Sequence, residues 1–149
     1  MNDQIENLLQ NLDKLNPDTQ PQWGTMTAQK MIEHLVNTFK IANGKLKVEC
    51  YSEEKKLPVL KKILMSERPM PKGFDSPANK LVTQNYEYEN IDEAKRVLRE
   101  EVNAFYKHFE ENPEAVLMNP TFGELNKEEW VQFHKKHLTH HLTQFGLIK

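Results

Sequence analysis

The fold depends most on Glu124-Leu-Asn-Lys-Glu-Glu-Trp-Val-Gln-Phe-His-Lys-Lys-His-Leu-Thr-His-His-Leu-Thr-Gln-Phe-Gly146, a segment near the end of this 149-residue chain. Asn126 and Glu129 have the spacing of a capping box, and Gly146 is the residue type that most often follows a helix end. The apolar residues between them recur at helical spacing and form one stripe: Trp130, Val131, Leu138, Leu142 and Phe145. We therefore predict a helix over residues 126–145.

Four of the six histidines of the chain lie in this helix. At about 100° per residue, His134, His137 and His141 project onto or beside the apolar stripe, while His140 points further round. His137 and His141 are one turn apart, and two imidazoles at that spacing can bind one divalent metal ion. The same pattern also fits one packed histidine with the others solvated or bonded to backbone. A third histidine from another helix would favour the metal site.

The helix resembles the last helix of the DinB/YfiT-like superfamily, in which a His-x-x-x-His pair precedes a glutamine, as His137, His141 and Gln144 do here. Other segments are similar to a small, functionally uncharacterised branch of that superfamily: Trp23-Gly-Thr-Met, Met31-Ile-Glu-His34-Leu, Asn119-Pro-Thr-Phe-Gly123 and Glu129-Trp130. The similarity extends from Trp23 to Gly146 and is weak in the middle. The branch usually has a histidine where Asn119 stands, so no role is assigned to Asn119.

The resemblance implies an all-α, DinB-like four-helix bundle that holds a divalent metal ion on three histidines, here His34, His137 and His141. Three neutral imidazoles leave a bound ion electrophilic, with open positions at which water can be acidified or a thiolate oriented. Zn²⁺ or Ni²⁺ is the expected ion. Gln144, one turn beyond His141, is a candidate to orient a ligand from outside, and a helix-end cap explains it equally well.

Two classes of function follow from the resemblance. Relatives in the superfamily include thiol-dependent transferases and isomerases, which implies a metal-dependent enzyme that uses a low-molecular-weight thiol on a small electrophilic substrate. A metal-water hydrolase is a close alternative. The other class is a non-catalytic stress protein that binds a metal or a small ligand. No Ser-His-Asp arrangement or paired carboxylates indicate metal-free catalysis, and the catalytic residues are not identified.

Composition bounds the remaining possibilities. The chain has the length of one domain, residues 1–149, with 38% hydrophobic and 28% charged residues and a net charge of −2. Both signs are scattered without a basic stripe, so we expect no nucleic-acid partner. No apolar run reaches the roughly 18 residues of a membrane span, and we expect no membrane partner. The polar N-terminus and the single Cys50 favour a cytoplasmic protein with a small-molecule ligand. A homodimer is left open.

Apolar periodicity predicts the other helices. Helices over residues 26–43, 57–65 and 91–110 join the one over 126–145 in the bundle, and a short extra helix over residues 3–15 packs outside it. His34 lies at the edge of the apolar stripe of its helix, where a partly exposed histidine would also fit. His108 falls off the stripe of its helix and is expected on the surface. The strongest core candidates, Leu98 and Phe105, lie in the same helix.

The other segments lack helical periodicity. Residues 66–90 are interrupted by prolines, and a connection of this length is either a lid over the histidine cleft or a plain crossover. Residues 45–51 alternate as in a short extended piece, which would make Cys50 a buried filler. Asn119-Pro-Thr-Phe-Gly123 is expected to form the turn into the histidine helix.

Overall fold

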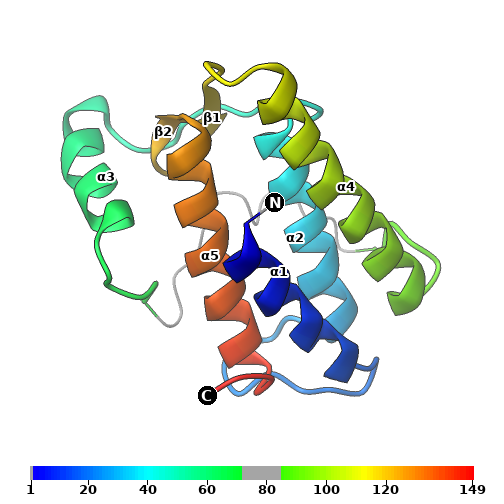
Figure 1. Ribbon diagram of the computed structural model, residues 1–149. Helices are drawn as coiled ribbons and strands as arrows, with labels where there is room; N and C mark the ends of the chain where they lie inside the picture. The colour runs from blue at the N-terminus through cyan, green and yellow to red at the C-terminus, as the bar shows by residue number, and fades with distance from the viewer. Residues whose placement is uncertain (1, 72–84) are drawn as a thin grey trace.

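The computed structural model describes residues 2–71 and 85–149 and confirms the predicted all-α class (Figure 1). Its described residues form five α-helices, two short 3-10 helices and one two-stranded sheet. The helices are α1 (Asp3–Gln10), α2 (Ala28–Ala42), α3 (Leu57–Met65), α4 (Ile91–Glu111) and α5 (Lys127–Gln144). The 3-10 helices are η1 (Asn11–Lys14) and η2 (Glu54–Lys56), and the strands are β1 (Leu117–Asn119) and β2 (Gly123–Leu125).

A short polar residue caps the start of four of the helices. The side chains of Asn2, Thr27, Asn90 and Asn126 each accept a hydrogen bond from the backbone N–H three residues on. The capping box at the start of α5 is complete, because the Glu129 carboxylate also accepts from the Asn126 N–H. At its other end Gly146 has a φ of 69°, and the Leu147 N–H donates to the Leu142 carbonyl at 2.8 Å. This arrangement is a Schellman motif, which fixes the last turn of the histidine helix.

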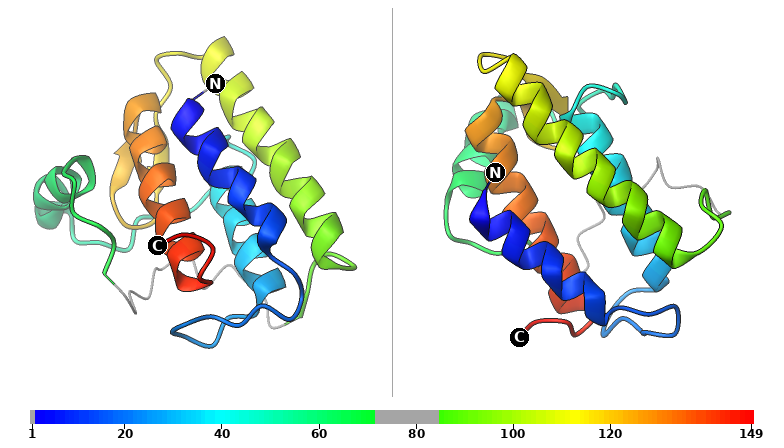
Figure 2. Two further views of the ribbon diagram at one scale, coloured as in Figure 1. Left: turned by 60° about the horizontal axis from the view of Figure 1, so that its bottom comes forward. Right: turned by 45° about the vertical axis from the view of Figure 1, so that its right-hand side comes forward.

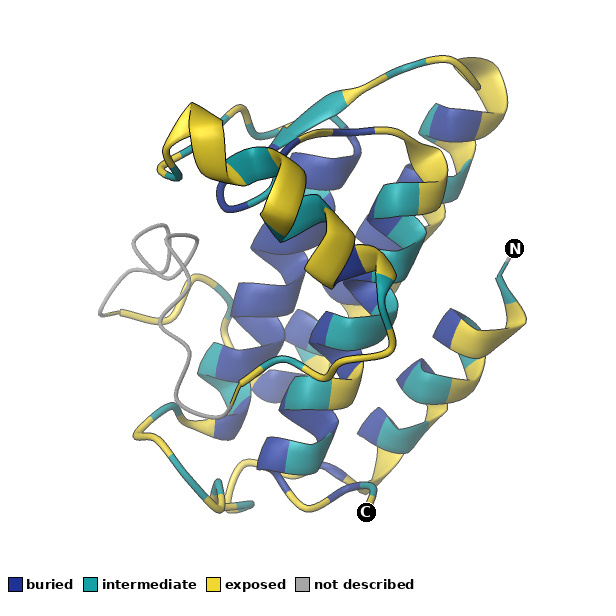
Figure 3. Cartoon of the chain, turned by 90° about the vertical axis from the view of Figure 1, so that its left-hand side faces the viewer, coloured by how far each residue is buried: buried dark blue, intermediate teal, exposed yellow. Residues whose placement is uncertain are grey.

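The core lies between the inner faces of the helices; Figure 3 shows most of α2 coloured as buried, and buried residues recurring along α5. α2 packs along α4, and α1 packs along α5. The two core candidates from the sequence are confirmed: Phe105 is 0% and Leu98 2% exposed. An aromatic cluster of Phe39, Phe105 and Phe109 joins α2 to α4, and Trp130 adds the start of α5.

The two short helices differ from the sequence prediction in their packing. The first is an integral part of the helical body, because the apolar residues of α1 and η1 and the one that follows are buried: Ile5, Leu9, Leu12 and Leu15. The left view of Figure 2 shows α1 lying between α5 and α4. α3 instead contacts α5 but lies away from the other long helices (Figures 1 and 3). Its one buried residue is Leu64, and Val59 is 60% exposed. Its nine residues are apolar on too many sides to form one packed face.

The turn before α5 is a β-hairpin that the sequence did not reveal. β1 and β2 are antiparallel, with Leu117 opposite Leu125. The Asn119 side-chain oxygen accepts hydrogen bonds from the N–H groups of Thr121 and Phe122 at 2.8 and 3.0 Å, so this residue shapes the turn. Residues 45–51 form no strand, and Cys50 is half-buried rather than a core filler.

Most of the segment predicted as a lid or crossover, residues 72–84, lies outside the described residues. Its described C-terminal end is fastened to α2, because the buried Glu33 carboxylate accepts hydrogen bonds from the backbone N–H groups of Glu87 and Tyr88 at 3.1 and 3.2 Å. Within the described part of the chain, no helix is both long and apolar enough to cross a membrane.

Candidate metal centre

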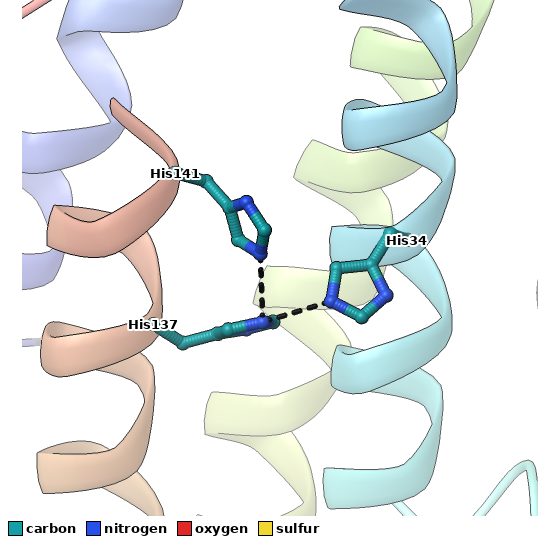
Figure 4. A group of neighbouring side chains, drawn as sticks. All are labelled: His34, His137 and His141. Atoms are coloured by element: carbon teal, nitrogen blue, oxygen red, sulfur yellow. Dashed lines mark hydrogen bonds between the residues drawn. The ribbon is translucent and has the colours of Figure 1, made fainter. Parts of the chain in front are cut away.

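Three histidines from two helices meet inside the helical body (Figure 4). His34 projects from α2, and His137 and His141 project from α5. The Nε2 atom of His137 lies 2.9 Å from Nε2 of His34 and 3.1 Å from Nε2 of His141. One ring nitrogen of each residue lies within 4.8 Å of the others. The three positions inferred from the resemblance are therefore neighbours in space; they are called the histidine triad below.

Burial keeps the triad uncharged. The exposed fractions of His34, His137 and His141 are 1%, 5% and 7%. Burial, with a smaller contribution from His140, lowers the pKa of His34 from 6.5 to about 4. Burial lowers the pKa of His137 and of His141 well below 6.5, and the neighbouring histidines add to the effect. Each ring is thus neutral near pH 7, the form in which an imidazole binds a metal ion.

Gln144 fixes the proton of His141. The Gln144 side-chain N–H donates to the Trp23 carbonyl at 3.0 Å, which turns the amide oxygen toward His141. That oxygen lies 2.7 Å from Nδ1 of His141, and because it can only accept, Nδ1 must carry the hydrogen. A neutral His141 therefore presents a bare lone pair on Nε2 to the other two histidines. Gln144 itself is buried and bridges α5 to the loop before α2, so it does not cap the helix end.

Hydrogen bonds alone do not satisfy three converging Nε2 atoms. Each imidazole nitrogen has a single in-plane site, either a lone pair or an N–H. His137 lies between His34 and His141 and can form one good hydrogen bond at that site, so one pair of the three nitrogens stays unmatched. A divalent cation would accept all three lone pairs. Nitrogens about 2.1 Å from one ion are separated by about 3.0 Å in octahedral and about 3.4 Å in tetrahedral geometry. The observed 2.9 and 3.1 Å are close to the octahedral value.

The surroundings of the triad are mainly apolar and aromatic. The Phe133 ring lies 5.1 Å from the ring of His137. No carboxylate or thiol joins the triad as a fourth metal-binding group among the residues described. Nδ1 of His34 is buried and has no hydrogen-bond partner within residues 2–71 and 85–149. Among these residues the triad thus offers three neutral ligands only.

The remaining three histidines lie in other environments. His134 is fully buried, stacked on Phe39 at 3.8 Å between ring centroids, and neither of its nitrogens has a hydrogen-bond partner in the described residues. Burial lowers its pKa from 6.5 to about 3. His140 lies beside the triad without joining it: its ring is 5.0 Å from that of His141 and 5.6 Å from that of Trp23. His108 was expected on the surface but is half-buried.

Sequence reasoning missed the contribution of Trp23. Its backbone carbonyl orients Gln144, and backbone groups leave no residue-type signal in a sequence. The resemblance pointed to Trp23 without giving it a role. Asn119, the other position in question, is buried in the hairpin turn and is bonded to backbone there.

Comparison with known proteins gives one match. The family model described as the DinB superfamily matches residues 1–145. No curated protein and no solved structure matches the chain significantly. The match includes all three histidines of the triad and Gln144, and it leaves out only the last four of the 149 residues.

Proposed function

The chain belongs to the DinB superfamily, and we propose that it binds one divalent metal ion through the Nε2 atoms of His34, His137 and His141. The observation that carries the proposal is the convergence of three buried, neutral imidazoles whose nitrogens cannot all pair with one another. Gln144 supports it, because it holds the proton of His141 on Nδ1 and leaves Nε2 bare. Zn²⁺ or Ni²⁺ suits three imidazole ligands.

We propose further that the protein is a transferase or isomerase that uses a low-molecular-weight thiol on a small electrophilic substrate. When bound, an ion with three neutral ligands supplies a Lewis-acid centre with open positions for a thiolate or a substrate group. The supporting observation is that the described residues offer the ion no fourth ligand. Structural sites commonly have four protein ligands, whereas catalytic sites keep a position open.

In this function the residues of the chain bind the metal ion and orient its ligands. His34, His137 and His141 hold the ion, Gln144 keeps the His141 ring in one orientation, and the Phe133 ring beside His137 keeps water away from that ligand. A second candidate is a non-catalytic metal-binding protein, and the low exposure of the triad, at most 7%, favours it. We also propose a cytoplasmic location and a small-molecule ligand.

Metal content tests the first part of the proposal. Elemental analysis of the purified parent should give about one Zn²⁺ or Ni²⁺ per chain. His34→Ala, His137→Ala and His141→Ala should each lose most of it, because two imidazoles bind far more weakly than three. His108→Ala is the control, since it also removes a histidine, here a half-buried one in α4 outside the triad, and should keep the metal. Parent-like metal content in all three triad variants would contradict the site.

Turnover tests the second part. The metal-loaded parent is incubated with 1-chloro-2,4-dinitrobenzene or monobromobimane and a panel of low-molecular-weight thiols. The enzyme proposal expects one thiol to be consumed faster than in the absence of protein, and expects His137→Ala to abolish the difference. If the metal-loaded parent accelerates none of these reactions, the non-catalytic candidate is favoured instead.

A further inference from the structure

A second concave site lies on the face of α5 that points away from the triad. It has a volume of about 1030 Å³, and none of the triad residues lines it. Its floor is α5, including Lys135, Thr139 and His140. One wall is α1, and the other is the segment of residues 65–71 that follows α3. At about 100° per residue, Lys135 lies roughly 160° around α5 from His137. We call this site the α5 groove.

The second wall of the α5 groove is held in place by side chains of α5. The Gln132 side-chain N–H donates to the carbonyls of Leu64 and Ser66 at 3.1 and 3.3 Å. The Lys136 ammonium donates to the Ile63 carbonyl at 2.6 Å. His140 and Met70 also line the groove. The contacts of Gln132 and Lys136 satisfy the carbonyls at the end of α3 and fix the position of the second wall relative to α5.

The charge of the α5 groove is positive. Three cationic side chains line it, Lys135, Lys136 and Arg68, against one carboxylate, that of Glu67. Lys136 is already bonded to a carbonyl, and burial lowers its pKa. Lys135 is half-buried, and neither its ammonium nor the Arg68 guanidinium has an ion-pair partner in the part of the chain that the structure describes. Arg68 is exposed, whereas Lys135 is a half-buried cation without an ion-pair partner among the described residues, and such a cation favours an anionic ligand.

The remaining residues that line the groove are suited to the apolar part of an organic ligand. Trp23 and Leu8 offer apolar surface, and Met70 and two prolines add to it from the second wall. Amides and hydroxyls on the floor and on α1 provide neutral hydrogen-bonding groups. A mostly apolar concave surface with a few placed charges is typical of small-molecule sites, and the volume lies at the upper end of their usual range.

We propose that the α5 groove binds a small organic anion, whose acidic group pairs with Lys135 and Arg68 and whose apolar body packs on Trp23. This site is separate from the triad and does not depend on a bound metal ion. The proposal can thus fail or hold independently of the proposed metal function.

The probe for this proposal is 8-anilinonaphthalene-1-sulfonate, an aromatic sulfonate, titrated by fluorescence into the folded parent. Saturable binding to one site per chain is expected. Lys135→Gln combined with Arg68→Gln should raise the Kd about tenfold or more, because two charge-assisted contacts are lost. Lys107→Gln combined with Lys127→Gln removes the same charge from exposed positions outside the groove and should change the Kd less than twofold.

Two further measurements separate the contribution of the cationic side chains from that of the apolar contact with Trp23. Uncharged N-phenyl-1-naphthylamine should bind more weakly than the sulfonate, and the Lys135/Arg68 double variant should not alter its affinity. Trp23→Ala should weaken both probes, whereas His137→Ala should weaken neither. Thermal melts by circular dichroism confirm that each variant is folded. Absence of saturable sulfonate binding, or an equal loss of affinity in the two double variants, would overturn the proposal.

Discussion

At the level of single residues, Gln144 connects the histidine triad to the loop before α2. Its amide is fixed at both ends, by the Trp23 carbonyl and by Nδ1 of His141. A glutamine at this position is visible in the sequence, but its two partners depend on how α5 meets residue 23. This dependence is why the sequence left two explanations open, a ligand-orienting residue and a helix cap.

Replacing Gln144 should weaken metal binding without removing a ligand. Gln144→Ala frees the His141 ring and should lower metal affinity about 10- to 100-fold, measured by competition with a chromogenic chelator. Gln144→Glu should restore only part of the affinity, because a carboxylate also accepts from the Nδ1–H but cannot donate to the Trp23 carbonyl. Thr143→Ala, at the neighbouring half-buried position of α5, is the control. Parent-like affinity in Gln144→Ala would show that the contact does not orient the ligand.

His134 predicts how stability depends on pH. Its pKa is lowered to about 3 by burial among Phe39, Phe105 and Trp130, against 6.5 in the unfolded chain. Between these values the unfolded state binds more protons than the folded state, so stability falls as the pH drops below 6.5. One such residue contributes a slope of about 1.4 kcal/mol per pH unit.

His134→Phe should remove this contribution. The variant fills the aromatic cluster with a group that does not titrate, so its stability should fall less steeply between pH 6.5 and pH 5 than that of the parent. The difference amounts to about 2 kcal/mol over this interval. Urea unfolding of the metal-free proteins at several pH values measures it. Parallel curves for parent and variant would show that His134 is not buried in its neutral form. His108→Phe serves as the control, because it makes the same replacement at a half-buried position in α4.

At the level of elements, the packing of α1 and α3 is the reverse of what the sequence predicts. α1 is part of the packed helical body, whereas α3 lies outside it. Both are short, and both have apolar residues at helical spacing. Helical spacing does not reveal which apolar faces find a partner, because that depends on the packing of the long helices. α1 has one narrow apolar stripe that fits beside α5, whereas α3 has apolar residues on its outer side as well.

Two truncations of apolar side chains test this assignment. Leu9→Ala in α1 should lower the free energy of unfolding by about 2–5 kcal/mol, because it leaves a cavity at a buried position. Val59→Ala in α3 should change it by less than about 0.5 kcal/mol, because that side chain is mostly exposed. Chemical denaturation gives both values. Equal costs at the two positions would contradict the described packing of α1 and α3.

Glu33 fastens the segment before α4 to α2. Its buried carboxylate accepts from the Glu87 and Tyr88 N–H groups and also from the side chain of Gln29 at 3.0 Å. Glu33→Ala should therefore increase hydrogen exchange at the amides of residues 87 and 88 while leaving the middle of α4 protected. Glu111→Ala, at an exposed end of α4, is the control. Unchanged exchange at residues 87 and 88 would show that the contact does not hold the segment.

At the level of the whole molecule, the sequence predicted the helices better than their arrangement. The extent of α5 and the placement of two triad histidines on it follow from local signals, the capping box, the glycine and the one-turn spacing of His137 and His141. His34 is 103 residues away from His137 in the sequence, and no local signal connects them. Its place beside them required the family resemblance. The hairpin before α5 and the α5 groove arise from contacts between distant segments, which periodicity does not encode.

The central claim is that α2 and α5 together hold one divalent ion. Anomalous X-ray diffraction from crystals of the Zn²⁺-loaded protein, recorded above and below the zinc absorption edge, locates the ion directly. The expected result is one peak per chain, about 2.0–2.2 Å from Nε2 of His34, His137 and His141. A peak at another position, or one within bonding distance of His137 and His141 but not of His34, would contradict the claim.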